Sequence, residues 1–197
     1  MAKFEARGRH VRLPMEVRAE GEEVRVEGYA AVFNEEADIG GFFREVIAPG
    51  AFTDAIGRDD VVFLWNHDSD TVMARTRSGT LQLEQDERGL KMSATLDMTD
   101  PDVQRIYPKM KRGDVDKMSF AFYPEVQEWD DSDDIPLRTI RSASLHDVSA
   151  VTHPAYDGTE IGLRSLAEHR KQARQHNFNK VQARKRLIGA ALNQRGL

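Results

Sequence analysis

Short runs of alternating hydrophobic and polar residues fill most of the chain as far as residue 152, a pattern typical of β-strands. Val24 and Val26 alternate with polar residues, and Gly28-Tyr-Ala-Ala-Val-Phe33 continues this run before a polar turn begins at Asn34. Residues 61–65, Val-Val-Phe-Leu-Trp, form a short continuous apolar run. Its β-branched and aromatic side chains favour a buried strand over a buried helical turn.

Further strand-like runs follow, at residues 80–84, 90–96, 117–123, 125–129, 137–142 and 143–152. Two polar turns, Asp86-Glu-Arg-Gly89 and Asp130-Asp-Ser-Asp-Asp134, separate neighbouring runs and predict two β-hairpins. In the run 90–96 the apolar residues recur at every second position, so they share one face of the strand.

Helical periodicity is confined to two stretches. Residues 102–112 carry an apolar stripe, and Thr99-Asp-Pro101 before them suits a helix cap and first turn. Pro108 should kink or shorten this helix, and Gly113 should end it. Beyond Thr159 the pattern becomes helical again.

Many short strands with few helices predict a β-rich α+β fold, either a β-barrel or a sandwich with helices attached. The strands do not alternate regularly with helices, which argues against a doubly wound parallel sheet. We expect residues 1–22 to form an N-terminal arm or edge strand, residues 23–163 to form the main domain, and residues 164–197 to form a basic, helical tail.

The distribution of charge also separates the C-terminal tail from the main domain. The 197 residues carry a formal net charge of −5, but residues 164–197 hold nine Lys and Arg against one acidic residue. The tail is therefore +8 and the remainder −13, which suggests separate roles for the two parts. A solvated basic surface helix is the equally weighted alternative.

The composition excludes several classes of protein. There is no cysteine, so disulfides, a thiolate nucleophile and Cys-based zinc sites are excluded. No apolar run approaches the roughly 20 residues of a membrane span, and the first ten residues lack the apolar region of a secretory signal. We expect a cytosolic protein without a membrane partner.

Three residues could carry chemistry. His67 follows the apolar run 61–65, and an imidazole, with an ordinary pKa of roughly 6.5, is the natural general base near neutral pH. Ser119 lies within a strand, on the face of the small Ala121, which leaves room for another group to approach its hydroxyl. A serine nucleophile needs a base within hydrogen-bond reach. Asp147 lies inside a strand, where an aspartate is unfavourable unless a partner binds it.

Each residue taken alone also has an ordinary structural role. A turn histidine is commonly bonded to a neighbouring carboxylate, and a strand serine to neighbouring backbone. A strand aspartate can simply face solvent.

Taken together, these segments resemble the prohead (capsid-maturation) serine proteases of tailed phages, a family similar in fold to the herpesvirus assemblins. The resemblance covers residues 27–163, and its specificity comes from the order and spacing of the matching segments. They are Gly28-Tyr-Ala-Ala-Val-Phe33, Glu45-Val-Ile-Ala-Pro-Gly-Ala-Phe52, Leu64-Trp-Asn-His-Asp68, Ala74-Arg-Thr76, Gly89-Leu90, Lys117-Met-Ser-Phe-Ala-Phe122 and Asp147-Val-Ser-Ala-Val-Thr-His-Pro-Ala155.

The resemblance implies that His67 is the general base, Ser119 the nucleophile and Asp147 the third catalytic residue. That third position is usually Glu in the phage enzymes and His in the assemblins, so Asp147 departs from both. The resemblance also implies an antiparallel β-barrel flanked by helices, no cofactor and no metal. It places no oxyanion donor, although the turn after Thr152 is a candidate.

The implied activity is endopeptidase cleavage of the major capsid protein or scaffold, and of the protease itself, inside the immature prohead in the host cytoplasm. Self-association is expected only by analogy with the dimeric assemblins. Nucleic acid is not expected as a partner.

Two other functions compete with this interpretation. A metallohydrolase would use His67, Asp68 or Asp70, His146 and His153 as ligands, but their spacing matches no known metal motif. A non-catalytic scaffold or nucleic-acid-binding capsid component would use the basic tail on phosphates or on an acidic capsid interior.

Overall fold

The computed structural model describes residues 5–8, 16–20 and 23–152, together with helical positions between residues 166 and 182. The chain divides into two compact units, Met1–Thr159 and Glu160–Leu197. None of the helices in the described part of the chain is long and apolar enough to cross a membrane.

The first unit is rich in strands. Its elements are β1 (Glu5–Gly8), β2 (Glu16–Glu20), β3 (Glu23–Val32), β4 (Ala37–Ile39), β5 (Phe43–Ile47), α1 (Thr53–Arg58), β6 (Val62–Trp65), β7 (Asp68–Arg75), β8 (Leu81–Gln85), β9 (Gly89–Asp97), α2 (Pro101–Lys111), β10 (Lys117–Asp130) and β11 (Leu137–Val151). The strand predicted at residues 61–65 and the hairpin predicted around residues 86–89 are confirmed. The runs predicted as separate strands on each side of Asp130–Asp134 join into the two long strands β10 and β11.

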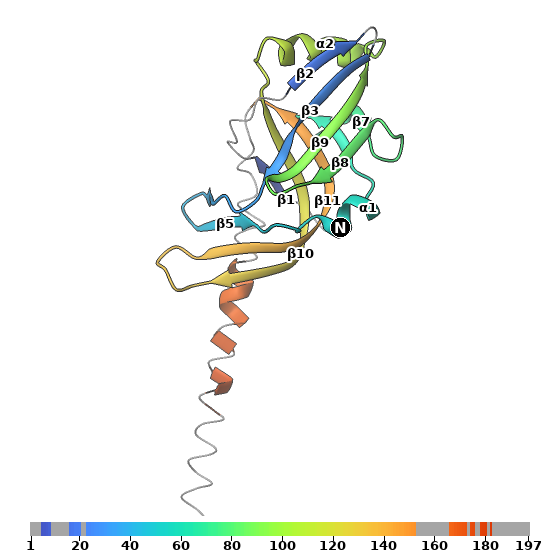
Figure 1. Ribbon diagram of the computed structural model, residues 1–197. Coiled ribbons are helices and arrows are strands. Elements are labelled where there is room, and N and C mark those ends of the chain that lie inside the picture. The colour runs from blue at the N-terminus through green and yellow to red at the C-terminus, as the bar shows by residue number, and fades with distance from the viewer. Residues whose placement is uncertain are drawn as a thin grey trace, which may run out of the picture. The chain divides into compact units, whose positions relative to one another are not determined.

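The strands form two sheets (Figure 1). The larger sheet has the order β1-β10-β11-β5-β4, with β6 paired to β11 and β7 paired to β6, and the smaller has the order β2-β3-β9-β8. Among the described strands neither sheet closes on itself, so the fold is β-rich α+β and the predicted barrel is not confirmed. The larger sheet is also mixed rather than antiparallel, because β5 and β6 both run parallel to β11.

One hydrophobic core receives side chains from both sheets. Val26 and Met92 come from the smaller sheet, and Phe120 and Ile140 from the larger, and all four are almost fully buried. The apolar face predicted for residues 90–96 points into this core. Burial of such side chains is the main favourable term in folding.

Helix α2 has the N-cap that its sequence predicts, and it continues through an internal proline. Asp100 is its N-cap, and its side chain accepts a hydrogen bond from Asp102 N. Pro108, which was expected to kink or shorten the helix, lies inside it without ending it. The buried stripe of Val103, Ile106 and Met110 holds the turns on both sides of this proline against the core.

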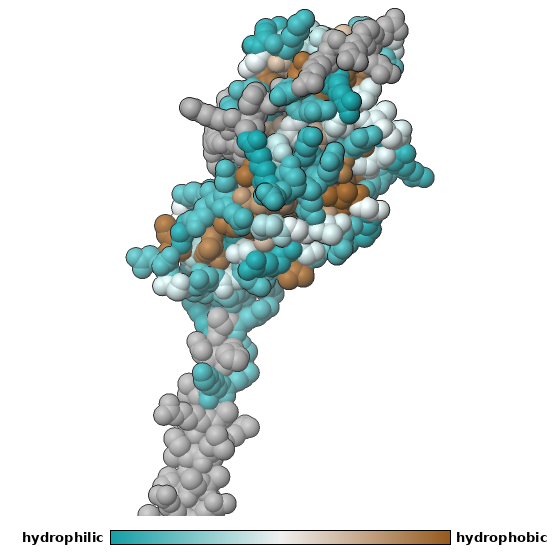
Figure 2. Space-filling view, in the orientation of Figure 1, coloured by the Kyte–Doolittle hydropathy of each residue, from teal (hydrophilic) through white to brown (hydrophobic). Residues whose placement is uncertain are grey.

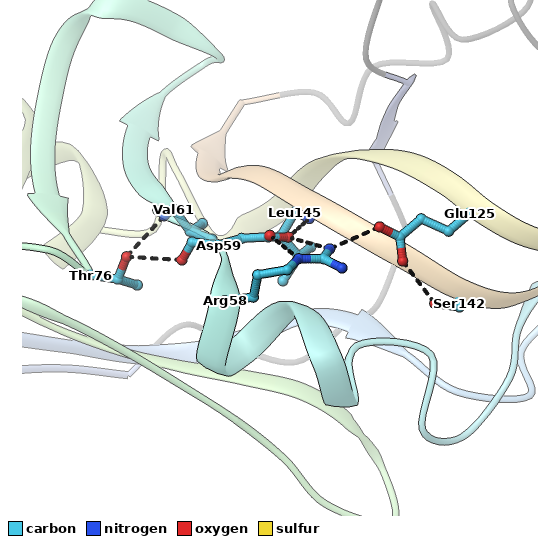
Figure 3. Close-up of polar contacts among 7 residues, drawn as sticks. All are labelled: Arg58, Asp59, Val61, Thr76, Glu125, Ser142 and Leu145. Atoms are coloured by element: carbon cyan, nitrogen blue, oxygen red, sulfur yellow. Dashed lines mark hydrogen bonds and ion pairs between the residues drawn. The ribbon is translucent and has the colours of Figure 1, made fainter.

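Asp59 helps to bridge a gap along one edge of β11. The first part of β11 pairs with β5 and the last part with β6. Between them, Leu145 N donates to the Asp59 carboxylate at 2.7 Å, and Arg58 links that carboxylate to Glu125 of β10 (Figure 3). Burial opposes ionisation of Asp59, but Arg58 and the Leu145 N–H together hold its pKa below the ordinary value. Asp59 is thus one of the groups that bridge this gap before β6 begins.

The face of the strand-rich unit shown in Figure 2 is mainly polar. Figure 2 shows hydrophobic residues as separate patches between hydrophilic ones on the face turned to the viewer. The large hydrophobic side chains that are exposed in the described part of this unit are Phe42, Val72, Tyr123, Val126 and Ile135. Scattered exposure of this kind is normal for a folded domain.

Candidate active site

Two neighbouring strands bring the serine and the aspartate to one face of the larger sheet. β10 and β11 pair antiparallel, with Ser119 opposite Ser149 and Ala121 opposite Asp147. Residues directly opposite each other on paired strands project to the same side. The alternation predicted from the sequence therefore gives Ser119 and Asp147 a shared face, although they are 28 positions apart in the chain.

The histidine reaches this face through a tight turn. β6 runs parallel to the end of β11, from Val62 opposite Asp147 to Trp65 opposite Ala150. Asn66 and His67 then form the turn into β7, with φ values of 49° and 58°. Two successive residues in the left-handed region are typical of a type I′ hairpin turn, which Asn tolerates better than most residues.

Asn66 also anchors this turn to β11. Its backbone N–H donates to Ala150 O at 3.0 Å, and its side-chain Oδ1 accepts from Thr152 N at 3.2 Å. A left-handed conformation at a residue other than glycine is unfavourable and persists only where surrounding contacts hold it. The turn therefore holds the His67 ring at a defined place beside β11.

The three predicted residues are in direct contact. His67 Nε2 lies 2.6 Å from Ser119 Oγ, and His67 Nδ1 lies 2.6 Å from Asp147 Oδ1. An ionised carboxylate can only accept hydrogen bonds, so Nδ1 carries the proton, and Nε2 is left to accept the serine hydroxyl proton. The His67 side chain keeps 18% of its surface exposed, and Asp147 keeps 4%.

A fourth residue, Ser149, completes the hydrogen bonds of this group. Its Oγ donates to Asp147 Oδ1 at 2.7 Å and accepts from the His67 backbone N–H at 3.3 Å. It also lies 3.2 Å from His67 Nδ1. No role was predicted for Ser149 from the sequence, although its position two residues after Asp147 places both on the same strand face.

The surroundings of Ser119 differ from the expectation. The small residues on its strand face predicted room for a group to approach, but Ser119 is completely buried. On one side β10 pairs with β11, and on the other Gly8 of β1 lies opposite Ser119. Residues 5–8 belong to the segment expected as an arm or edge strand, and they lie directly beside this serine.

Among the residues that the structure describes, the ligands expected for a metallohydrolase do not form a metal-binding group. His67 is engaged by Ser119 and Asp147, and the Asp68 carboxylate accepts from Asp70 N and Thr71 Oγ1. His146 is exposed, and His153 lies outside the described residues. Within the described ranges no group of three His, Cys, Asp or Glu side chains could hold a metal ion. The turn after Thr152, the candidate for oxyanion donors, also lies outside them.

A hydroxyl, an imidazole and a carboxylate in series are the arrangement that serine hydrolases use for acyl transfer. Comparison with known families agrees with this class, because residues 13–172 match the model of the caudovirus prohead serine proteases. The match spans most of the chain, and the protein belongs to this family. It is a serine peptidase of phage prohead maturation. No curated protein and no solved structure matches the chain.

Proposed function

We propose that this protein is a serine endopeptidase in which Ser119 is the nucleophile, His67 the general base and Asp147 the residue that orients and charges the imidazole. The observation that carries this proposal is the unbroken series of two 2.6 Å contacts, from Ser119 Oγ through the imidazole to Asp147 Oδ1. These are hydrogen-bond distances at which proton transfer is efficient.

The reaction proceeds through an acyl-enzyme. His67 Nε2 takes the hydroxyl proton while Ser119 Oγ bonds to the peptide carbonyl carbon. The imidazolium then gives this proton to the departing amine nitrogen, and the C–N bond breaks. Water attacks the resulting ester with His67 again as base, which releases the new carboxyl end and restores the serine hydroxyl.

Asp147 acts without exchanging a proton itself. Its carboxylate holds the proton on His67 Nδ1 and stabilises the imidazolium that forms as Ser119 attacks. An aspartate is shorter than the glutamate usual at this position. The direct parallel pairing of β6 with β11 supports its assignment, because it brings the histidine turn within 2.6 Å of the shorter side chain.

The substrates proposed for this site are the capsid or scaffold proteins of the immature prohead, and the protease itself. The charge of −13 on residues 1–163 against +8 on residues 164–197 supports a tail that is separable from the domain. We expect self-cleavage beyond Leu163. Intact-mass spectrometry should then find a shortened C-terminus in the active protein and the full mass in Ser119→Ala, whereas identical masses would contradict self-cleavage.

The nucleophile is tested with a fluorophosphonate probe, which forms a covalent bond with an activated serine. Wild-type protein should be labelled at Ser119, and Ser119→Ala should fold normally and remain unlabelled. Ser144→Ala, which removes a hydroxyl elsewhere on β11, is the matched control and should be labelled like wild type. A non-catalytic scaffold would give no labelling at Ser119 in any of the three proteins.

A further inference from the structure

The outer edge of β10 is the place where an extended peptide could lie beside Ser119. A strand edge offers unpaired N–H and C=O groups to which an extended segment adds as a further strand. β11 already occupies the inner edge of β10 along its whole length. A peptide that pairs with β10 beside Ser119 must therefore use the outer edge.

This edge is occupied by the chain itself at the position of the serine. β1 pairs antiparallel with β10 over four residues, from Glu5 opposite Phe122 to Gly8 opposite Ser119. Among the described strands, β1 is the only neighbour of β10 on this edge and forms the end of the sheet. Ser119 is completely buried in this arrangement, so no peptide carbonyl can reach its hydroxyl until some segment moves.

The geometry of paired strands explains why β1 lies where a substrate would. Residues opposite each other have Cα atoms about 4.5–5.5 Å apart. A peptide that pairs with β10 opposite Ser119 therefore runs directly alongside the residue that carries the nucleophile, and Gly8 holds that position now.

We propose that β1 is an autoinhibitory strand, and that residues 5–8 occupy the edge of β10 on which an extended peptide substrate pairs with the enzyme. This inference rests on the proposed function of Ser119. β1 has four residues while β10 has fourteen, and β1 is an edge strand, so it is well suited to leave without disturbing the core. Its attachment to the same chain gives it the high effective concentration of a tethered competitor.

Two single proline substitutions in the full-length chain test this inference, Ala6→Pro and Arg7→Pro. Along an edge strand, alternate residues direct their N–H groups toward the neighbouring strand or away from it. One of the two prolines therefore removes a hydrogen bond to β10. The other replaces an N–H that faces outward, which an edge strand tolerates, and it serves as the matched control.

The readout is the rate at which a fluorophosphonate probe labels Ser119. If β1 covers the site in roughly nine of ten molecules, releasing it should raise the labelling rate about tenfold. Exactly one of the two variants should show this acceleration. A synthetic peptide of residues 1–12, added in excess, should slow the labelling of that faster variant, and circular dichroism should show that both variants keep their strands.

The possible results separate this inference from the function on which it rests. Labelling at the wild-type rate in both variants, or no protection by the peptide, would overturn the autoinhibitory role and leave Ser119 as the nucleophile. Absence of labelling at Ser119 in wild type and both folded variants would instead overturn the proposed function.

Discussion

β10 and β11 bury polar side chains at both ends of the hairpin that they form. At the end of β11, Asp147 and Ser149 contact His67 and, through it, Ser119. Near the β10–β11 turn, Arg138 is fully buried and forms an ion pair with Glu45 of β5 at 3.0 Å. The two groups share the same strands but differ in the chemistry they allow.

The Arg138 group is closed to solvent and to proton transfer. Arg138 Nε donates to Gln127 Oε1 at 2.7 Å, its guanidinium lies 5.8 Å from the centre of the Trp129 ring, and both partners of the ion pair are almost completely buried. Arginine stays protonated at all physiological pH values, so this pair cannot act as acid or base. The buried charges of Arg138 and Glu45 are compensated by each other and by neighbouring polar groups.

The His67 group differs in two respects. It contains an imidazole, the side chain most often used as a general base, and this side chain keeps some exposed surface. Buried polar residues on strands therefore do not mark a functional site by themselves. They do so here because a hydroxyl, an imidazole that can accept its proton and a carboxylate stand in series. The difference between the His67 group and the Arg138 group can be tested by substitutions at each end of the hairpin.

The largest effect is expected for Asp147→Asn. The amide can hold the wrong tautomer of His67 and cannot stabilise the imidazolium, so the cleavage rate should fall about 10⁴-fold, as for the same change in the chymotrypsin-type triad. Asp147→Glu, which keeps the carboxylate, should lose much less. The measurement is cleavage of a capsid-protein substrate, with circular dichroism to verify folding.

His153→Ala is the control for this experiment, because His153 is the nearest other candidate for the third role in the same segment. It should keep the wild-type rate. Loss of cleavage in His153→Ala, with near wild-type activity in Asp147→Asn, would move the third role from Asp147 to His153.

At the other end of the hairpin, Glu45→Gln should affect stability rather than catalysis. It leaves the Arg138 charge buried without its partner, which should lower the free energy of unfolding by about 3–5 kcal/mol. Urea denaturation measures this loss. The control is Glu36→Gln, which removes a half-exposed partner of Arg44 and should cost less than about 1 kcal/mol.

The rate of probe labelling per folded molecule should be the same in Glu45→Gln and wild type at low temperature. A large loss of labelling without loss of stability would show that the two ends of the hairpin are coupled. The Arg138 group would then affect catalysis and not stability alone.

Ser149→Ala should have an intermediate effect on catalysis. The substitution removes the hydrogen bond to Asp147 and the acceptor for the His67 backbone N–H, so His67 and Asp147 lose part of their alignment. We expect kcat to fall about tenfold, equivalent to one charge-assisted hydrogen bond, with KM nearly unchanged.

Ser149→Thr keeps the hydroxyl and should recover part of the rate, provided that the extra methyl group is accommodated. Ser144→Ala is the matched control on the same strand. Equal kcat values in Ser149→Ala and Ser144→Ala would exclude a positioning role for Ser149.

The smallest effect is expected for Asp59→Asn, the residue that bridges the edge of β11. The amide oxygen still accepts from Leu145 N, but the charge interaction with the half-exposed Arg58 is lost, so we expect about 0.5–1 kcal/mol of destabilisation at pH 7. The pKa of Asp59 is lowered in the folded protein. Its stabilising effect is therefore complete above the unfolded carboxyl pKa of roughly 3.9 and is lost as pH falls through the lower folded value.

Unfolding by urea at pH 7 and at pH 3 measures this difference, which should shrink at the lower pH. Glu87→Gln, at an exposed turn position, is the control and should change stability little at either pH. An equal loss at both pH values in Asp59→Asn would show that the charge of Asp59 does not carry the effect.

Much of the site could be predicted from local sequence, because strand alternation is a local property. Because side chains alternate along a strand, Ser119 lies on the other face of β10 from the large apolar residues of that strand, and Asp147 and Ser149 share one face of β11. The run 61–65 correctly predicted a strand that ends just before His67. The ordered motifs identified the family, and the roles of Ser119, His67 and Asp147 remain proposals that the experiments above will test.

Other features depend on pairings between distant segments, which no local pattern encodes. The apolar run of β6 does not reveal that it runs parallel to β11, nor that Asp59 helps to bridge the gap before it. For the same reason the predicted antiparallel barrel became two open sheets, one of them mixed. The left-handed turn at Asn66 and His67 forms because Ala150 and Thr152 hold it, and these partners lie more than eighty residues away.

The sequence by itself predicted several of the strands, which of their faces are apolar and which residues could carry proton-transfer chemistry, but it missed β4, β5 and β7. Only the tertiary structure decided that Ser149 joins Asp147 and His67, that Ser119 is buried, and that residues 5–8 lie beside it on the edge of β10. The physical reason is that strand identity follows from neighbouring residues, whereas strand pairing and burial depend on contacts between segments far apart in the chain.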